Sequence, residues 1–123
     1  MPISKNVLTE QDDNGLSLRH VNAKDTTIKR RFNVNLSQSA TVQINVASRT
    51  GSGSYSSWTI RVSLDGITFA NVPNYSTGLT LSTFAAAVSD IIDVAGYMML
   101  EVACTTASTY TTETVDIIVC RQS

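Results

Sequence analysis

The chain has 123 residues, of which 42% are hydrophobic and 15% are charged, and its formal net charge is −1. That length fits one domain with its own core, and the nearly balanced charge argues against a general nucleic-acid binder. The opening Met-Pro-Ile-Ser-Lys lacks the apolar segment of a signal peptide, and no apolar run approaches the roughly 18 residues of a membrane helix. We therefore expect a cytoplasmically made protein that binds neither membrane nor nucleic acid.

The start of the chain is polar and carries much of the positive charge. We expect residues 1–26 to form an N-terminal arm or edge strand ahead of a β-sandwich domain of residues 27–123. Because the segment has few apolar residues, it would bury little apolar surface on its own. We therefore expect the arm to contact a partner rather than fold back as a compact element. The alternative is an ordinary solvated terminus. Six basic residues are candidate contacts with an acidic neighbour, in salt-sensitive binding: Lys5, Arg19, Lys24, Lys29, Arg30 and Arg31.

Alternation of apolar and polar residues predicts β-strands through the rest of the chain. Residues 79–84 and about 89–94 are also expected to be extended. The clearest alternation occurs in five segments: 32–36, 40–46, 58–64, 98–104 and 115–119. Together these segments predict an antiparallel β-sandwich, jelly-roll or Ig-like, of seven or eight short strands. The same parity predicts a core that includes Val42, Ile44, Ile60, Val62, Leu100, Val102 and Val119.

One dipeptide predicts a specific turn. Asp65-Gly66 stands between Leu64 and Ile67, where alternating segments meet. Such a pair is typical of a two-residue type I′ hairpin turn, in which both central residues have positive φ. Gly66 is therefore expected to be irreplaceable.

Patterns of catalytic or metal-binding residues are missing. His20, the single histidine, lies in a polar segment and is interpreted as a surface residue. Asp90 and Asp93 would fall on opposite faces of a strand, which suits neither a glycosidase pair nor a metal clamp. Residues 12–14, Asp-Asp-Asn, could offer oxygen atoms to calcium, but they do not form an EF-hand loop. We expect no enzyme, no cofactor and no metal site.

Two cysteines and several aromatic residues have packing or binding interpretations. Cys104 and Cys120 lie in apolar stretches and are interpreted as buried thiols, with a cross-strand disulfide as the minor alternative. Trp58 shares the parity of Ile60 and is assigned to the core. Aromatic rings in loops can stack on sugar rings or fill a partner's pocket, and three tyrosines are candidates for such contacts: Tyr55, Tyr75 and Tyr110.

The stretch Trp-Thr-Ile-Arg-Val-Ser-Leu-Asp-Gly-Ile-Thr-Phe at 58–69 resembles an aromatic-x-φ-x-V-S-x-D-G-x-x-[F/W] hairpin that recurs in β-sandwich virion proteins of tailed phages. Residues 92–102 and 114–119 look like the two closing strands of the same module, so the resemblance covers about half of the chain. It implies a structural role in capsid decoration, in a head–tail connector, or in a tail or fibre.

Among these roles we expect a capsid decoration (cement) protein, which would stabilise the shell through many symmetric protein–protein contacts. Its partner would be the major capsid protein or another virion protein, and it would itself be a homo-oligomer, for example a trimer. It would be made in the host cytoplasm and located in the virion. The alternative is a tail- or fibre-associated adhesin, a carbohydrate-binding β-sandwich module that uses the loop tyrosines.

Overall fold

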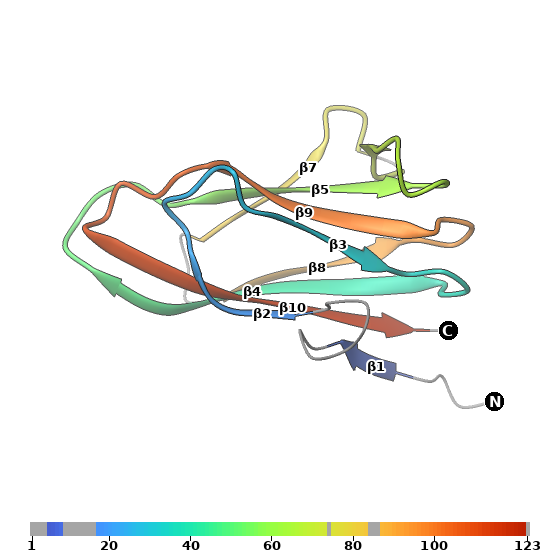
Figure 1. Ribbon diagram of the computed structural model, residues 1–123, viewed down its shortest axis with the longest axis horizontal. Coiled ribbons are helices and arrows are strands. Elements are labelled where there is room, and N and C mark those ends of the chain that lie inside the picture. Colours follow the sequence, from blue (N-terminus) through green and yellow to red (C-terminus); the bar gives the residue numbers. More distant parts are fainter. Residues whose placement is uncertain (1–4, 9–16, 74, 84–86, 123) are drawn as a thin grey trace.

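The computed structural model describes residues 5–8, 17–73, 75–83 and 87–122, with the backbone alone for 5–8 and 17–20. These residues form two antiparallel sheets that pack face to face (Figure 1) and contain no helix, which confirms the predicted all-β sandwich. The strands are β1 (Lys5–Leu8), β2 (Ser17–Asn22), β3 (Lys29–Asn33), β4 (Ser39–Thr50), β5 (Ser57–Ser63), β6 (Ala70–Asn71), β7 (Leu79–Ser82), β8 (Ala87–Asp93), β9 (Met99–Thr106) and β10 (Thr112–Gln122).

The strand order identifies the sandwich as a jelly roll. In the first sheet β2 pairs with β10, β10 with β4, and β4 with β8, while β1 also pairs with β10 beyond the end of β2. In the second sheet β3 pairs with β9, β9 with β5, and β5 with β7, while β6 also pairs with β5. Eight strands ordered 2-10-4-8 and 3-9-5-7 form two Greek keys, which distinguishes this fold from the Ig arrangement.

The core lies between the two sheets, where the alternating residues meet. All seven residues predicted for the core are fully buried, which confirms the parity assignment. Trp58 is also fully buried, and its indole Nε1 donates a hydrogen bond to Ser56 Oγ at 3.1 Å. Both cysteine thiols are free, as the favoured interpretation predicted. Cys104 is buried as expected, whereas Cys120 is only half-buried. Desolvation raises the pKa of Cys104 to about 11, so its thiol stays protonated.

Two strands end earlier than predicted. Leu36 and Leu64 were assigned to alternating rows, yet their side chains are 89% and 69% exposed. The chain turns before Leu36 because the Asn33 side chain accepts the amide of Asn35 at 2.9 Å. It turns before Leu64 is buried because Ser63 Oγ accepts the amide of the glycine at 66, at 2.8 Å. In each case a polar side chain captures a backbone amide that a longer strand would pair.

The two-residue turn at Asp65-Gly66 is a wrong prediction. β5 pairs with β6 through Arg61↔Asn71, so a longer loop, residues 64–69, joins the two strands. Asp65 Oδ1 organises this loop by accepting the amides of the residues at 67 and 68, at 2.8 and 2.9 Å. Gly66 does have the expected positive φ, 77°.

The N-terminal segment also differs from expectation. The described parts, β1 and β2, pair with β10, and Val21 of β2 joins the core. The expectation of an arm that does not fold back is therefore wrong for these residues, whereas the alternative expectation of an edge strand agrees with their pairing at the edge of the first sheet. The reason is that β4 occupies only one side of the long strand β10, so the other side offers backbone partners to polar residues as well as to apolar ones. The calcium alternative at 12–14 lies outside the described residues.

Candidate interaction surfaces

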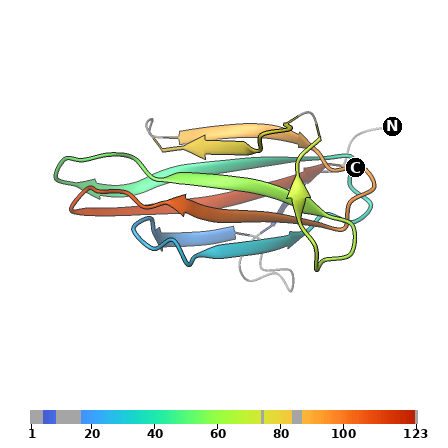
Figure 2. The same cartoon turned by 90° about the horizontal axis from the view of Figure 1, so that it is seen from above.

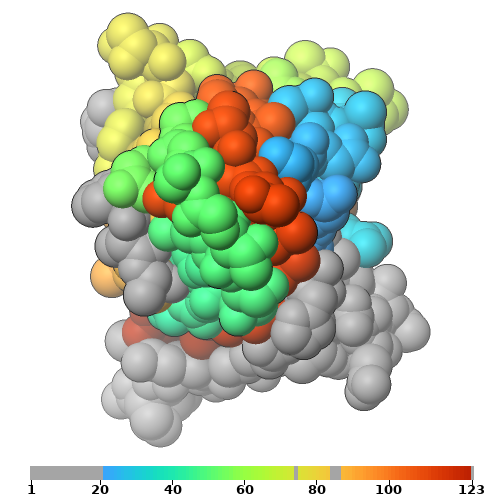
Figure 3. Space-filling view, turned by 90° about the vertical axis from the view of Figure 1, so that its left-hand side faces the viewer, coloured from blue at the N-terminus to red at the C-terminus, as the bar shows by residue number. Residues whose placement is uncertain are grey.

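Three loops form one end of the sandwich, and two of the predicted tyrosines meet there. Residues 51–56, 107–111 and 23–28 lie side by side at this end (Figure 3). The ring centroids of Tyr55 and Tyr110 are 6.0 Å apart and the ring planes are tilted by 32°. We call this pair the tyrosine end.

Arg49 connects the tyrosine end to a buried carboxylate. Its guanidinium carbon lies 5.2 Å from the ring centroid of Tyr55 and 4.6 Å from that of Tyr110. Its Nε lies 3.0 Å from Oε2 of Glu113, whose side chain has no exposure to solvent. Cations favour the faces of aromatic rings, so the arginine stabilises both the rings and the carboxylate.

Glu113 receives hydrogen bonds from several loops. Three hydroxyls donate to its carboxylate: Thr83 Oγ1 at 2.7 Å, Ser56 Oγ at 3.0 Å and Ser108 Oγ at 3.0 Å. Desolvation acts to raise the pKa of Glu113, but the hydrogen bonds from Arg49 and the three hydroxyls outweigh it, and the pKa is lowered. The carboxylate is therefore ionised and fully engaged in joining the loops, which leaves it no general acid–base role.

The third predicted tyrosine lies elsewhere. Tyr75 packs against the core between β6 and β7, and its hydroxyl donates to Asp90 Oδ2 of β8 at 3.2 Å. The charge of Asp90 raises the pKa of Tyr75. The structure therefore brings together Tyr55 and Tyr110 and does not bring Tyr75 to them.

Four of the six predicted basic contacts have described side chains, and these four lie in different surroundings. Lys24 Nζ donates to the carbonyls of Ser108 and Tyr110 at 3.2 and 2.7 Å, so it supports the tyrosine end. Lys29 and Arg30 are exposed on β3, and Arg31 pairs with a glutamate of the neighbouring strand. The side chains of Lys5 and Arg19, like that of His20, lie outside the described part of the chain.

Sequence reasoning missed a charged cluster on the outer face of the second sheet. Glu101 was correctly placed opposite the core row, yet it is fully buried between Arg61 Nη2, 2.6 Å from Oε1, and Arg31 Nε, 3.1 Å from Oε2. The ring of Phe69 lies 4.4 Å from the Arg31 guanidinium and 5.9 Å from that of Arg61. Desolvation acts to raise the pKa of Glu101, but the two arginines outweigh it and the pKa is lowered. Only the register, which places Glu101 opposite both arginines, reveals the cluster.

Exposed apolar side chains gather at the opposite end of the sandwich. Three connections meet there (Figure 1): β3–β4, β5–β6 and β8–β9. Met98 joins them, because its amide donates to the carbonyl of Ser63 at 2.9 Å and its carbonyl accepts the amide of Val34 at 2.8 Å. Ile67 is 80% exposed. We call this surface the apolar end, and its exposed residues are Leu36, Leu64, Ile67 and Met98.

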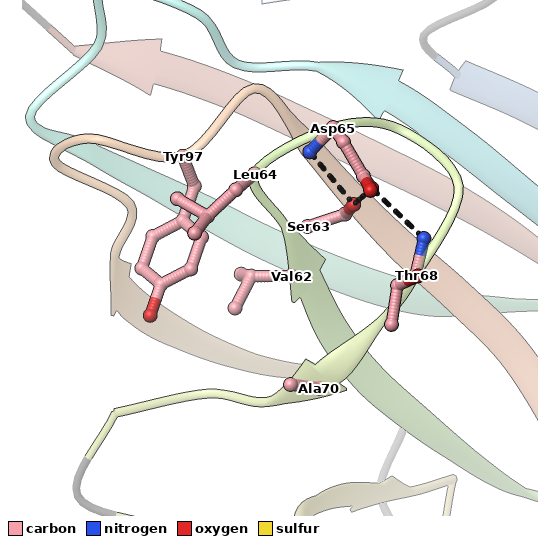
Figure 4. A pocket seen from close by; sticks show the side chains of 7 residues that line it. All are labelled: Val62, Ser63, Leu64, Asp65, Thr68, Ala70 and Tyr97. Carbon is pink, nitrogen blue, oxygen red and sulfur yellow. Dashed lines mark hydrogen bonds between the residues drawn. The ribbon is translucent and has the colours of Figure 1, made fainter.

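A pocket of about 260 Å³ adjoins the apolar end (Figure 4). It is lined by Val62, Ser63, Leu64, Asp65, Thr68, Ala70 and Tyr97. Leu64 and the ring of Tyr97 lie side by side on one wall, and Asp65 bonds to the backbone of Thr68 on the other. The Asp65 carboxylate is occupied by these loop amides, so the pocket offers mainly an apolar surface, which fits an apolar side chain of a partner better than a reacting substrate.

The described residues contain no group of three or more histidine, cysteine or acidic side chains that could hold a metal ion. Nor does the described part of the chain contain a helix long and apolar enough to cross a membrane.

Comparisons with known proteins support the fold. No protein-family model and no curated protein matches the sequence. The crystal structure of SPBc2 prophage-derived protein YomS is similar, with a TM-score of 0.54 and 12% identity over 100% of this chain and 96% of that chain. The whole chain therefore has the fold of a solved protein of prophage origin.

Proposed function

We propose that this chain is a non-enzymatic structural protein of a phage virion, and specifically a capsid decoration protein that docks through its apolar end. The prophage origin of a protein with the same fold supports a phage source. Jelly rolls are common in viral capsids, where they act through protein–protein contacts. The engagement of Glu101 and Glu113 within the sandwich supports a structural role over a catalytic one.

The observation that carries this proposal is the conformation of Leu36. This residue has a positive φ of 64° while its side chain is 89% exposed. A residue other than glycine in the left-handed region costs about 1–2 kcal/mol, and an exposed leucine gains no burial to offset that cost. Strain at an exposed apolar residue supports a binding role for its side chain.

The neighbours of Leu36 enlarge the proposed contact. Leu64, Ile67 and Met98 extend the apolar surface across two further connections, and the pocket lies beside them. A capsid protein that covers this surface would gain about 25 cal/mol for each Å² of apolar area removed from water. Repeated over many symmetric positions, such contacts would stabilise the shell.

The test uses particles from a phage whose gene for this protein has been deleted. Purified protein is added, and binding is followed by co-sedimentation and negative-stain imaging. Wild type should coat the shell, whereas Leu36→Gly should remain folded and lose at least about tenfold in affinity, equal to about 1.4 kcal/mol. Tyr55→Ala, at the opposite end, is the matched control and should coat normally. Protein that is inert toward capsids, yet is found at tail tips by immunogold labelling of wild-type virions, would overturn the capsid role.

The alternative function is that of a tail- or fibre-associated carbohydrate-binding module. The convergence of Tyr55 and Tyr110 at one end favours it, since aromatic faces stack on sugar rings. A glycan array should then show binding that Tyr55→Ala and Tyr110→Ala abolish and that Tyr75→Phe retains. An array without binding, or with binding unchanged by the two alanine variants, would count against this function.

A further inference from the structure

The two long flanks of the sandwich each present an edge strand. Viewed from above (Figure 2), β8 and β7 run along one flank, and β2 and β3 run along the opposite flank. Within the described residues, β3 pairs with β9 alone and β8 with β4 alone. As far as the described ranges show, each of these strands has one side without a strand partner, which could accept another strand.

The hydrogen-bond pattern identifies the free backbone groups of β3. Val34 donates its amide to Met98 O at 2.8 Å, which continues the ladder between β3 and β9. Because paired and unpaired residues alternate along an edge strand, the backbone groups of Lys29, Arg31 and Asn33 point away from β9. The carbonyl of Asn33 already accepts a hydrogen bond from Arg121 Nη1 at 3.2 Å, so the groups available to another strand are those of Lys29 and Arg31 and the amide of Asn33.

The same reasoning applies to β8 on the other flank. Val94 donates its amide to Gln38 O at 3.1 Å, next to the paired strand β4. The backbone groups of Ser89, Ile91 and Asp93 therefore point away from β4. The amide of Ile91 already donates to Asp90 Oδ1 at 2.8 Å, so at this residue the carbonyl is the group available to another strand. The Ile91 side chain is 66% exposed on this strand.

The two edges carry opposite charges. Lys29 and Arg30 on β3 are exposed and form no ion pair with the rest of the described chain. On β8, Asp93 is exposed and Asp90 is half-buried, and neither carboxylate has an ion pair within the described ranges. Asp90 accepts the hydroxyl of a tyrosine and Asp93 accepts a turn amide, so each carboxylate has a hydrogen-bond donor within the chain and no cation.

From these features we propose that the β3 edge of one copy binds the β8 edge of a second copy of this chain. Main-chain hydrogen bonds would join the strands, Lys29 and Arg30 would face Asp90 and Asp93, and the neighbouring chain would cover Ile91. Because the two edges differ, the contact is heterologous and generates a ring or a filament. The interface rests on the strands and their charges and is independent of the role in a virion.

The charges on the two edge strands have an alternative explanation, because charged side chains also prevent edge strands from pairing with other chains. That explanation predicts a monomer. The test therefore measures the mass of the purified full chain by light scattering at low and high salt. We expect a multiple of 13.3 kDa at about 0.05 M salt and a shift toward the monomer at about 1 M, where charges more than about 3 Å apart are screened. A monomer at low salt and at the highest soluble concentration would overturn the proposal.

Charge reversal tests the pairing itself. The basic-edge variant Lys29→Glu/Arg30→Glu and the acidic-edge variant Ser89→Lys/Asp93→Lys should each be monomeric at low salt. An equimolar mixture of the two should recover the assembly, since each altered edge then meets a complementary one. Ser52→Lys and Ser52→Glu, in an exposed loop away from both edges, are the controls and should assemble as wild type does.

Folding of each variant is checked by circular dichroism and thermal melting. Asp93 accepts the amide of Ala95 at 3.0 Å, so its replacement could weaken that turn. Ser89→Lys alone leaves this contact intact and should also reduce assembly at low salt. Folded variants that assemble as wild type does, or a mixture that stays monomeric, would refute the β3–β8 pairing.

Discussion

Arg49 and Glu113 occupy directly opposed positions on β4 and β10, and their side chains form an ion pair with Nε 3.0 Å from Oε2. The glutamate is fully buried, whereas 21% of the arginine side chain is exposed. The pair thus joins the two longest strands of the first sheet at the tyrosine end. Loss of the arginine would leave a buried carboxylate without its cation.

We predict that Arg49→Ala lowers the free energy of unfolding by about 3 kcal/mol, because removing one partner of a buried pair leaves an uncompensated charge. Urea denaturation followed by tryptophan fluorescence measures this change. Arg61→Ala is the matched control, since Glu101 keeps Arg31 as a second cation. It should cost less than Arg49→Ala, and equal losses in the two variants would contradict the special role of Arg49.

The two buried glutamates predict a loss of stability in acid. The pKa values of Glu101 and Glu113 lie below their ordinary value of 4.5 in the folded protein. A carboxyl group whose pKa is lowered by folding contributes stability above its unfolded pKa and loses it as the pH falls through the folded pKa. The urea midpoint should therefore stay nearly constant between about pH 6 and 7 and decline below about pH 4.5.

Glu113→Gln separates this effect from other acid-sensitive groups. Asp25 and Asp65 also have lowered pKa values, which arise from hydrogen bonds to Thr27 for the first and to loop amides for the second. The glutamine variant should be less stable than wild type at neutral pH, and the difference between the two should shrink as the pH falls. A difference in stability that stays constant from about pH 7 to 3 would show that the pKa of Glu113 is the same in the folded and unfolded states.

The parity of apolar residues predicted the core but not the ends of strands. Leu64 has the same parity as Val62, and nothing in that pattern reveals that Ser63 captures the next loop amides and ends β5. Alternation reports which way a side chain points only while the strand continues. The apolar end was therefore hidden in the sequence, because three of its residues, Leu36, Leu64 and Met98, were assigned to apolar rows.

Contacts across strands were the other part that the sequence could not predict. Glu101 was correctly placed on the outer face, but its burial depends on Arg31 and Arg61 standing opposite it. Register is set by turns and by the packing of whole strands, which one strand's pattern does not contain. An edge strand was one of the two expectations for residues 1–26, but for the same reason the sequence did not predict that β10 would be the partner of β1 and β2.

Gly66 provides a test of the observed loop. With φ at 77°, an alanine there should cost about 1 kcal/mol, since the left-handed conformation disfavours a Cβ atom. The added atom would lie 3.5 Å from Met99 Cγ, an ordinary contact, so backbone strain and not collision causes the loss. Gly66→Val should lower the melting temperature further, and Gly66→Asn should recover part of the alanine loss. An alanine variant as stable as wild type would show that the loop relaxes to negative φ.

Two leucines of the second sheet measure the value of burial. Leu100 is fully buried on β9. Leu64 lies in the loop directly after β5, and its side chain is 69% exposed. Leu100→Ala should cost about 2–5 kcal/mol, as should truncation of the buried Ile60, because each leaves a cavity in the core. Leu64→Ala should change stability by less than about 0.5 kcal/mol. Similar losses for the two leucines in urea denaturation would mean that the apolar end is packed in solution.

Leu36 should show the opposite behaviour, because its replacement relieves strain. Leu36→Gly removes the Cβ atom that disfavours a φ of 64°, a gain of about 1–2 kcal/mol, while glycine's greater freedom in the unfolded chain costs about 0.5–1 kcal/mol. We therefore expect a net gain of up to about 1.5 kcal/mol in the free energy of unfolding. Leu64→Gly is the matched control: it removes another exposed leucine, at a residue without positive φ, and should lower stability. If both glycine variants lose stability equally, the backbone at Leu36 is not strained, and the main support for a binding role of its side chain is lost.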